Sequence, residues 1–311
     1  MTARSAGAGA HQKDAALRAL WRRRRTWATM YLSTLAGAKK MAGGGTPMEP
    51  EAIDEAAKLL CAARLARTRF AGLPPARRPV DEAEAYVLQD VLHARLIAAG
   101  RGAVVGHKIG CTTPVMQRFL GIDNPCAGGV FGPTVQHENG AFRHADFLRV
   151  GVECEIAVRL ARDLPASRAP YDRDSVADAI GSCMAAIEIV DDRYEDYRAL
   201  DAPTLIADDF FNAGCVLAEP GEDWRELDLR TIGGRMMING DEVGSGRGGD
   251  VLGHPLSALA WFANLRAARN RHLRAGEFVL LGSVVETKWL AAGDHVEIAI
   301  EGLGNATARF S

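Results

Sequence analysis

The chain has 311 residues, a formal net charge of −2, and 48% hydrophobic and 24% charged residues. This length is enough for one large domain or two modest ones with a sizeable core. The balanced charge gives no reason to expect a nucleic acid as a partner of the whole chain. No apolar run approaches the ~20 residues of a membrane span, and no signal-peptide pattern stands near the start, so we expect no membrane partner.

Six cysteines are spread along the chain without a Cys-x-x-Cys pair: Cys61, Cys111, Cys126, Cys154, Cys183 and Cys215. Most stand in apolar contexts, as the reduced and buried thiols of a cytosolic protein do. We therefore predict a cytoplasmic protein without a zinc site.

Residues 1–47 differ from the rest, because they hold nine Lys/Arg and a single acidic residue, Asp14. A basic arm that binds RNA or anionic membrane is one interpretation, and an organelle transit segment is another. We favour a disordered or dispensable extension, with Met41 or Met48 as a possible start, because domain-like patterning begins only after it.

Two helices are predicted next. The first has apolar residues at helical spacing from Ile53 to Cys61, and the second has Asp81 as its N-cap with Glu84 three residues on. Both look structural. We expect an N-terminal helical part at 48–100 and a catalytic mixed-β domain at 101–311.

The short apolar strand Val104–Gly110 carries His107 and Lys108. Lysine is rarely buried without a partner, so Lys108 is a catalytic candidate, while His107 on the opposite face is more readily structural. Thr112 follows at the start of a helix, where free N–H groups and hydroxyls form an anion site. Residues 120–132 are dense in glycine and turn residues, and we predict a loop that covers a site.

The segment Val150–Val158 alternates polar and apolar residues, which predicts a strand. Glu153 and Glu155 then lie on one face, roughly 6 to 7 Å apart along the chain. Glu188 interrupts a second apolar run, where a lone charge needs a partner. A divalent cation shared by the three carboxylates is one solution; a solvated Glu153/Glu155 face with Glu188 paired to an arginine is the alternative.

A helix is expected from Tyr171 to about Met184, and a loop rich in carboxylates and amides at 201–214. Its Asp208, Asp209 and Asn212 could reach a metal-bound ligand, although turn and capping roles are as common. Later segments predict an Asn-Gly hairpin at 239–240, a helix opening with Pro255, and strands at 277–281, 294–300 and 305–310. Early helices and late strands indicate an α+β fold.

Five motifs in this order resemble the fumarylacetoacetate hydrolase superfamily, and within it the branch of 2-keto-4-pentenoate hydratases and 4-oxalocrotonate decarboxylases. The resemblance covers about residues 48–311. The motifs are Gly106-His-Lys-Ile-Gly110 with Thr112-Thr113, Val152-Glu-Cys-Glu-Ile156, Ala186-Ile-Glu-Ile-Val-Asp191, Gly253-His-Pro-Leu-Ser-Ala-Leu-Ala-Trp261 and Gly282-Ser283.

The resemblance implies a mixed β-sheet roll with an N-terminal helical part, and a homo-oligomer. It implies Mg²⁺ or Mn²⁺ held by Glu153, Glu155 and Glu188, with Lys108 and Glu153 as catalytic residues. The residues expected to bind substrate are Ile109, Thr112, Asp209, Asn212 and Ser283.

One position departs from the pattern. Many hydratases of this branch carry an aspartate after the proline of the 120–132 segment, where this chain has Cys126. A thiol is a poor substitute, because its reference pKa lies about four units higher. His107, Asp123 and Asp209 are the candidates to compensate.

We therefore predict a metal-dependent hydro-lyase that hydrates a 2-hydroxypenta-2,4-dienoate-like small molecule from aromatic catabolism, by stabilising an enolate. Decarboxylation of a 2-oxo-3-hexenedioate and C–C hydrolysis of an acylpyruvate use the same intermediate. A decarboxylase needs a cation for the second carboxylate, and Arg118 or Arg193 are the candidates. A non-catalytic protein that binds 2-oxo acids is a further alternative.

Overall fold

The computed structural model describes residues 48–311. The predictions for residues 1–47, a basic binding arm or a dispensable extension, lie outside this range. Residues 51–311 form one compact unit. The division at residue 100 between a helical part and a mixed-β domain stays a prediction.

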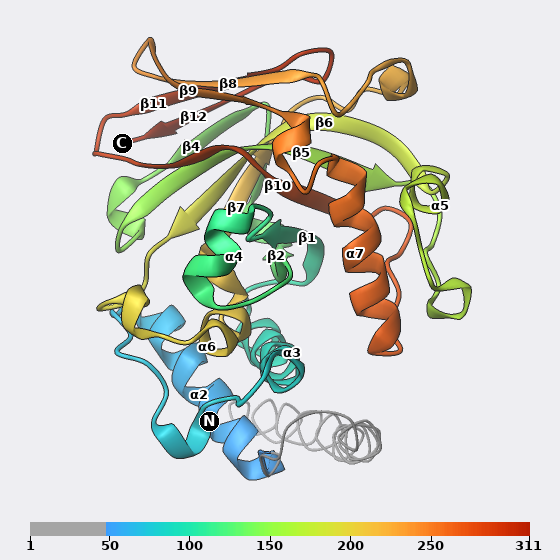
Figure 1. Ribbon diagram of the computed structural model, residues 1–311. Helices are drawn as coiled ribbons and strands as arrows, with labels where there is room; N and C mark the ends of the chain where they lie inside the picture. The colour runs from blue at the N-terminus through green and yellow to red at the C-terminus, as the bar shows by residue number, and fades with distance from the viewer. Residues whose placement is uncertain (1–47) are drawn as a thin grey trace, which may run out of the picture. The chain divides into compact units, whose positions relative to one another are not determined.

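Helices dominate the first part of the described chain. Helices α2 (Pro50–Ala66) and α3 (Glu82–Ala98) match the two predicted ones. As expected, Asp81 caps α3, since its side chain accepts a hydrogen bond from the Glu84 backbone N–H. Helix α3 packs on the short helix α6 (Ala202–Ala207), and Figure 1 shows α2, α3 and α6 grouped on one side of the strands.

The larger of two sheets in residues 48–311 has seven strands, in the order β2-β1-β10-β5-β6-β7-β3. Its long central strands pair antiparallel, whereas β1 runs parallel to β10 and β3 parallel to β7. The strands are β1 (Val104–Gly110), β2 (Cys126–Phe131), β3 (Val135–His137), β5 (Val150–Leu160), β6 (Ile180–Asp191), β7 (Asn212–Leu217) and β10 (Phe278–Trp289).

The second sheet has five strands within the described residues, in the order β4-β12-β11-β8-β9. Strands β8 and β9 form the predicted hairpin, in which Asn239 and Gly240 take φ of 55° and 91° as a type I′ turn requires. The strands are β4 (Asn139–Phe142), β8 (Gly233–Ile238), β9 (Asp241–Arg247), β11 (His295–Ile300) and β12 (Gly304–Phe310).

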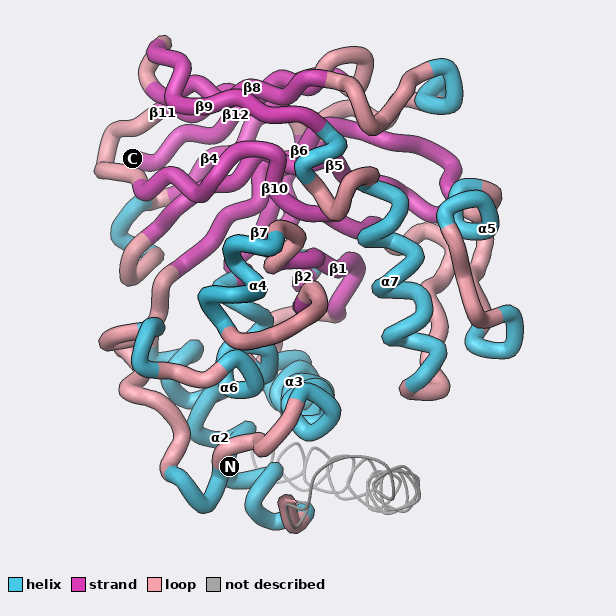
Figure 2. Tube along the Cα trace, viewed as in Figure 1, coloured by secondary structure: helices cyan, strands magenta, loops and turns pink. Residues whose placement is uncertain are grey.

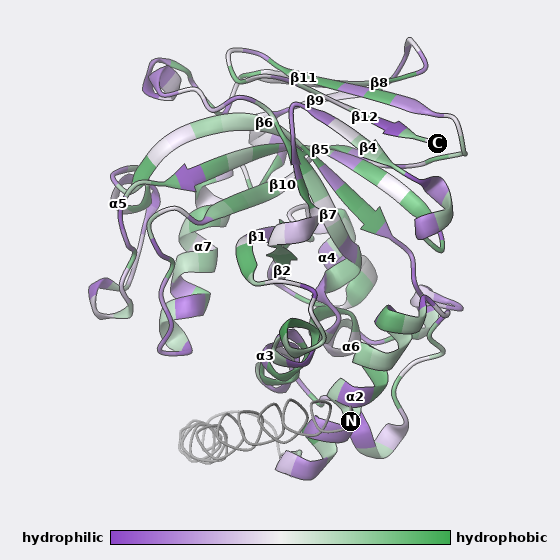
Figure 3. Ribbon diagram, turned by 180° about the vertical axis from the view of Figure 1, so that it is seen from behind, coloured by the Kyte–Doolittle hydropathy of each residue, from purple (hydrophilic) through white to green (hydrophobic). Residues whose placement is uncertain are grey.

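The remaining helices lie against the strands. Helix α7 (Pro255–Ala268) opens with Pro255 as predicted and packs on β10 and on α5 (Arg173–Ala177), while α4 (Pro114–Leu120) follows β1. Figure 2 shows the strands gathered in one half of the view, and in Figure 3 the central strands β5, β6 and β10 are largely in the hydrophobic colours. The α+β prediction is confirmed. No helix in residues 48–311 is both long and apolar enough to cross a membrane.

Three predicted segments were wrong. The segment 120–132, expected to be a covering loop, contains strand β2, whose residues are all buried. Its glycines have no side chains, so backbone and side-chain atoms of other segments pack directly on the strand. The helix expected from Tyr171 to Met184 spans only Arg173–Ala177, and the chain continues as strand β6 from Ile180. Pairing along the whole of β5 overrides the local helical pattern there.

The segment 201–214, predicted as a loop, also has regular structure. It contains α6, a short 3₁₀ turn at Asp209–Phe211 and the start of β7. Asp201 caps α6 by accepting a hydrogen bond from the Thr204 backbone N–H. The prediction of a loop was therefore wrong, and most of this segment is buried.

Candidate active site

Three glutamates from two neighbouring strands meet inside the larger sheet. Glu153 of β5 lies directly opposite Glu188 of β6 in the strand register, and Glu155 follows on the same face of β5. One carboxylate oxygen of each lies within 4.8 Å of the other two. Glu155 and Glu188 are both 0% exposed. Since like charges directly opposite each other destabilise a sheet, this arrangement requires a compensating cation.

The carboxylates show the electrostatic cost of this arrangement. Burial, followed by the charges of Glu188 and Glu153, raises the pKa of Glu155 well above its usual range. Burial and the charge of Glu188 likewise raise the pKa of Glu153. Among residues 48–311, no hydrogen-bond partner is found for Glu155 Oε1 or Glu188 Oε2, although both atoms are buried. Such oxygens fit the ligand set of a hard divalent cation.

Lys108 is the nearest positive charge. Its ammonium, on strand β1, is 3.2 Å from Glu188 Oε1, and the residue is 2% exposed. Burial alone would lower the pKa of Lys108, but the charges of Glu188 and Glu153 raise it above its usual range. When all three carboxylates are ionised, as metal binding requires, one ammonium leaves two negative charges, which is the charge that a divalent cation neutralises.

Neighbouring groups fix the orientation of each carboxylate. Thr287 donates a hydrogen bond to Glu153, and the Gly282 backbone N–H donates to Glu155 Oε2 at 3.0 Å. Asn212 Nδ2 donates to Glu188 Oε1 at 2.9 Å. The contact from Gly282 depends on its φ of +119° and on the lack of a Cβ, which would lie 2.5 Å from a Thr112 side-chain atom.

The residues predicted to bind substrate fall into two groups. Thr112 lies against Gly282, and Ser283 is opposite Glu155 in the register of β10 with β5, so both are close to the carboxylates. In this conformation the Ser283 hydroxyl donates to the carbonyl oxygens of Cys154 and Val285. Ile109 is fully buried next to Lys108.

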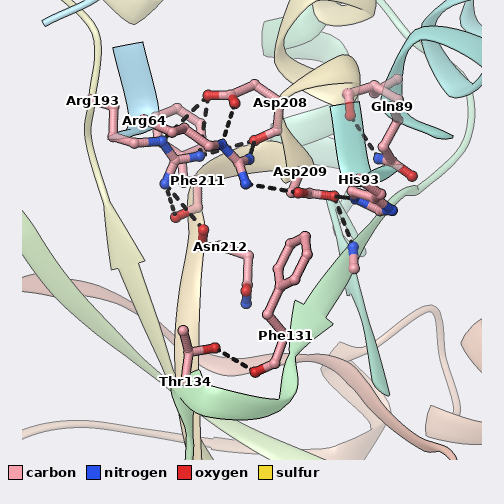
Figure 4. A network of polar contacts seen from close by, with 12 residues as sticks. Arg64, Gln89, His93, Phe131, Thr134, Arg193, Asp208, Asp209, Phe211 and Asn212 are labelled. Carbon is pink, nitrogen blue, oxygen red and sulfur yellow. Dashed lines mark hydrogen bonds and ion pairs between the residues drawn. The ribbon is translucent and has the colours of Figure 1, made fainter. Parts of the chain in front are cut away.

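Asp209 and Asn212, the other two residues in that set, have partners within the protein. Asn212 contacts Glu188, as described above. The Asp209 carboxylate lies 2.6 Å from His93 Nε2 and 3.0 Å from Arg64 Nη1, and it accepts a hydrogen bond from the Gly129 backbone N–H. Asp209 thus belongs to a charged network with Arg64 and His93 (Figure 4), three residues before Asn212, which contacts Glu188.

Cys126 lies in the same region as Lys108. It begins β2 opposite Gly110, and a Cβ built on Gly110 would be 3.5 Å from the Cys126 sulfur and 3.2 Å from Lys108 Nζ. Burial, with the neighbouring Cys111 thiol 3.5 Å away, raises the pKa of Cys126 well above its usual range. Cys126 is therefore a neutral thiol, unsuited to accept a proton at neutral pH.

The remaining candidates are farther from the chemistry or already paired. His107 faces Glu277 at 3.7 Å and packs on Phe262, while Asp123 is exposed. Arg193 is buried and donates to Asp208 and to the carbonyls of Asp208, Phe211 and Asn212. Arg118 lies on α4 beside an open hollow that Asp123 also lines.

Sequence reasoning did not single out Arg64, His93, Phe210 or Thr287. His93 follows Gln89 by four residues on α3, so the two form a polar stripe beside the apolar face of that helix. From this spacing, a buried polar contact of α3 could have been predicted. Arg64, Phe210 and Thr287 show no comparable pattern, because their contacts are with residues distant in sequence.

Comparisons with known proteins show the family of this chain. Residues 132–311 match the family model "Fumarylacetoacetate (FAA) hydrolase C-terminal". The chain is 36% identical to a TodF product hydratase of Pseudomonas putida, covering 76% of this chain and 88% of that protein. It is 34% identical to a 2-keto-4-pentenoate hydratase of Paraburkholderia phymatum, with 83% and 97% covered. A 4-oxalocrotonate decarboxylase of Pseudomonas putida is 31% identical, with 73% and 85% covered.

A solved structure is similar over nearly the same range. It is a 4-oxalocrotonate decarboxylase from Pseudomonas putida G7 complexed with magnesium and adipate, with a TM-score of 0.80 and 28% identity, covering 86% of this chain and all of that one. The resemblance inferred from the five motifs is thereby confirmed. The chain belongs to the fumarylacetoacetate hydrolase family, in the branch of 2-keto-4-pentenoate hydratases and 4-oxalocrotonate decarboxylases.

Proposed function

We propose that this protein is a divalent-metal-dependent hydro-lyase that hydrates a 2-hydroxy-2,4-dienoate such as 2-hydroxypenta-2,4-dienoate. The observation that carries the proposal is the cluster of half-buried Glu153 with buried Glu155 and Glu188 beside Lys108. Two of its carboxylate oxygens have no hydrogen-bond partner among residues 48–311. Relatives with hydratase names support the reaction class, and the magnesium of the similar decarboxylase structure supports the metal.

Glu153, Glu155 and Glu188 would hold Mg²⁺ or Mn²⁺, which take oxygen ligands. When bound, the cation supplies Lewis-acid stabilisation of the negative charge that a 2-oxo acid develops on its 2-oxo oxygen as a proton moves at the adjacent carbon. The hydrogen bonds from Thr287, Gly282 and Asn212 hold the three carboxylates in place.

Lys108 adds a second positive charge to the site. Its ammonium is held by Glu188 and is shielded from water, so it stabilises an oxyanion more strongly than a solvated lysine would. Thr112 and Ser283, with the backbone at Ile109, are the groups that we assign to the substrate carboxylate. A bound substrate would need the Ser283 hydroxyl to turn away from its present carbonyl partners.

Decarboxylation of a 2-oxo-3-hexenedioate is the second candidate, and the neutral thiol of Cys126 favours it. Loss of CO₂ leaves an enolate without any base that activates water, whereas hydration requires proton transfers that a thiol of raised pKa performs poorly. The second carboxylate would require a cation. Since Arg193 is committed to Asp208, Arg118 is the remaining residue of the two considered.

Turnover of 2-hydroxypenta-2,4-dienoate tests the proposal. Metal-stripped protein should be inactive, and added Mg²⁺ or Mn²⁺ should restore formation of 4-hydroxy-2-oxopentanoate. The reaction is monitored by the loss of the dienol's absorbance. Metal-dependent release of CO₂ from 2-oxo-3-hexenedioate, without conversion of the dienoate, would replace the hydratase by the decarboxylase. Homo-oligomer formation and a cytoplasmic location stay predictions of the same proposal.

A further inference from the structure

The turn that connects α6 to β7 has an unusual backbone. Three consecutive non-glycine residues lie in the left-handed region, with φ of 57° at Asp209, 46° at Phe210 and 68° at Phe211. Left-handed residues normally occur singly, and large side chains disfavour that region. A run of three, two of them aromatic, persists only where surrounding contacts impose it.

Charged groups from distant elements contact the aspartates of this turn (Figure 4). Arg64, on α2, joins both aspartates of the turn: its Nε lies 2.5 Å from Asp208 Oδ1 and its Nη1 lies 3.0 Å from Asp209 Oδ2. His93, on α3, holds the other oxygen of Asp209 at 2.6 Å. Arg193 and Tyr194 also donate to Asp208. A planar guanidinium can reach two carboxylates at once in this way.

The same turn presents two side chains to the acidic cluster. The ring centroid of Phe210 lies 5.0 Å from Lys108 Nζ, within the range of a cation–π contact. Asn212, two residues on, donates to Glu188 Oε1. The turn packs tightly on β2, since a Cβ on Gly128 would lie 2.7 Å from the Asp209 carbonyl oxygen. The turn therefore contacts one proposed metal ligand and the lysine beside it.

We propose that Arg64 and His93 are positioning residues of the acidic site. By holding Asp208 and Asp209 they keep the left-handed turn in place, and the turn sets Phe210 against Lys108 and Asn212 against Glu188. The inference rests on the proposed function in that it takes Lys108 and Glu188 as working parts of the site. A purely structural network would affect stability alone, whereas a positioning network also sets metal affinity and the rate of turnover.

The first test replaces Arg64 by lysine. Arg64→Lys keeps the charge but cannot reach both aspartates in the same geometry. We expect Mn²⁺ affinity, measured by electron paramagnetic resonance titration of the metal-free protein, to fall at least about tenfold, as for other groups that orient metal ligands. We expect kcat to fall while KM changes less. Arg67→Lys is the matched control, since Arg67 is 54% exposed and pairs with Asp146; it should leave both quantities unchanged.

The second test compares Phe210 with a buried phenylalanine outside the turn. Phe210 faces Lys108, whereas Phe310 of the smaller sheet packs on Phe142 and Phe147. Phe210→Leu should lower kcat about tenfold, and Phe310→Leu should lower only the melting temperature. This pair decides the question if Arg64→Lys does not fold.

Two results would overturn the proposal. One is an Arg64→Lys protein with a lower melting temperature but wild-type Mn²⁺ affinity and kcat. The other is an equal kcat for Phe210→Leu and Phe310→Leu. Because Mn²⁺ affinity is measured without substrate, it tests the Arg64 step even if the dienoate proves not to be the substrate. A wrong substrate and a wrong positioning role therefore give different results.

Discussion

The two sheets of this protein differ in how closely they follow the rules of β-structure. In β11, buried Val296, Ile298 and Ile300 alternate with more accessible residues, and its register with β12 and β8 is unbroken. In the larger sheet, Glu153 pairs with Glu188 across β5 and β6, and β10 shifts register three times along β5. We assign stability to the smaller, more regular sheet, which shifts register between β8 and β9, whereas the larger sheet holds the proposed metal ligands.

The difference shows where this chain departs from a sequence optimised for folding. Mutually repelling carboxylates and a left-handed turn each oppose folding, and each lies within contact of Lys108 or Glu188. The apolar strands and the charged network around them hold these features in place. Substitutions in the two sheets should therefore separate stability from metal binding and turnover.

The largest effect is expected for Glu188→Gln. The variant keeps the shape of the side chain but removes one of three ligand carboxylates, so Mn²⁺ binding and turnover should both be lost. Calorimetric titration and the dienoate assay measure the two effects. Glu297→Gln, at a 52% exposed position of the smaller sheet, should change neither. Wild-type Mn²⁺ affinity in Glu188→Gln would remove this residue from the site.

Asp209→Asn should lower the free energy of unfolding by about 3 kcal/mol at pH 7, because it leaves buried cationic partners uncompensated. Burial alone would raise the pKa of Asp209, but the charges of His93 and Arg64 and the hydrogen bonds from His93 and the Gly129 backbone hold it well below its usual range. A lowered pKa adds stability above the unfolded-state pKa of about 3.9, and that stability is lost as the pH falls below it.

Urea unfolding of the metal-free wild type and of Asp209→Asn at several pH values measures the difference between their free energies of unfolding. Asparagine also tolerates the left-handed backbone, so the variant adds little strain of its own. The gap between the two proteins should narrow below about pH 4. A gap that stays constant between neutral and acid pH would show that the Asp209 charge is not the source.

Addition of Mn²⁺ to metal-free protein should raise the free energy of unfolding by about 2.7 kcal/mol when the free metal is 100 times its Kd. The added charge relieves repulsion that exists only in the folded chain. Thermal unfolding followed by circular dichroism, with Glu188→Gln in parallel, checks this. An equal gain in the variant would place the stabilising metal elsewhere.

Ile298→Val should have the smallest effect. Loss of one methylene from the core of the regular sheet costs about 1 kcal/mol of stability. The same loss is expected with and without Mn²⁺, and Mn²⁺ affinity should not change. A change in affinity would show that the smaller sheet is coupled to the site.

Features that depend on neighbouring residues in the chain could be predicted from the sequence. Alternation placed Glu153 and Glu155 on one face, a lone charge in an apolar run singled out Glu188, and capping and turn residues located α3 and the 239–240 turn. Each of these is a local pattern with a period or a fixed spacing.

Features set by distant contacts could not be predicted. Gly128 and Gly129 of β2 led to the prediction of a loop. The residues that pack on them, Asp209 and His93, come from other parts of the chain. No local signal indicates that Phe210 adopts a left-handed backbone, since that conformation is imposed by contacts of its neighbours with Arg64 and His93. Residues 180–184 were predicted as helix for the same reason, because the pairing of β6 with the distant strand β5 is not visible in the local sequence.

The most direct test of the account is the position of the metal. Crystals of the protein grown with Mn²⁺ should give one anomalous-scattering peak at the manganese edge, bonded to carboxylate oxygens of Glu153, Glu155 and Glu188. We predict that Asn212 still contacts Glu188 in that structure. A peak at another position, or no peak with Lys108 as the sole cation contacting the three carboxylates, would contradict the central claim.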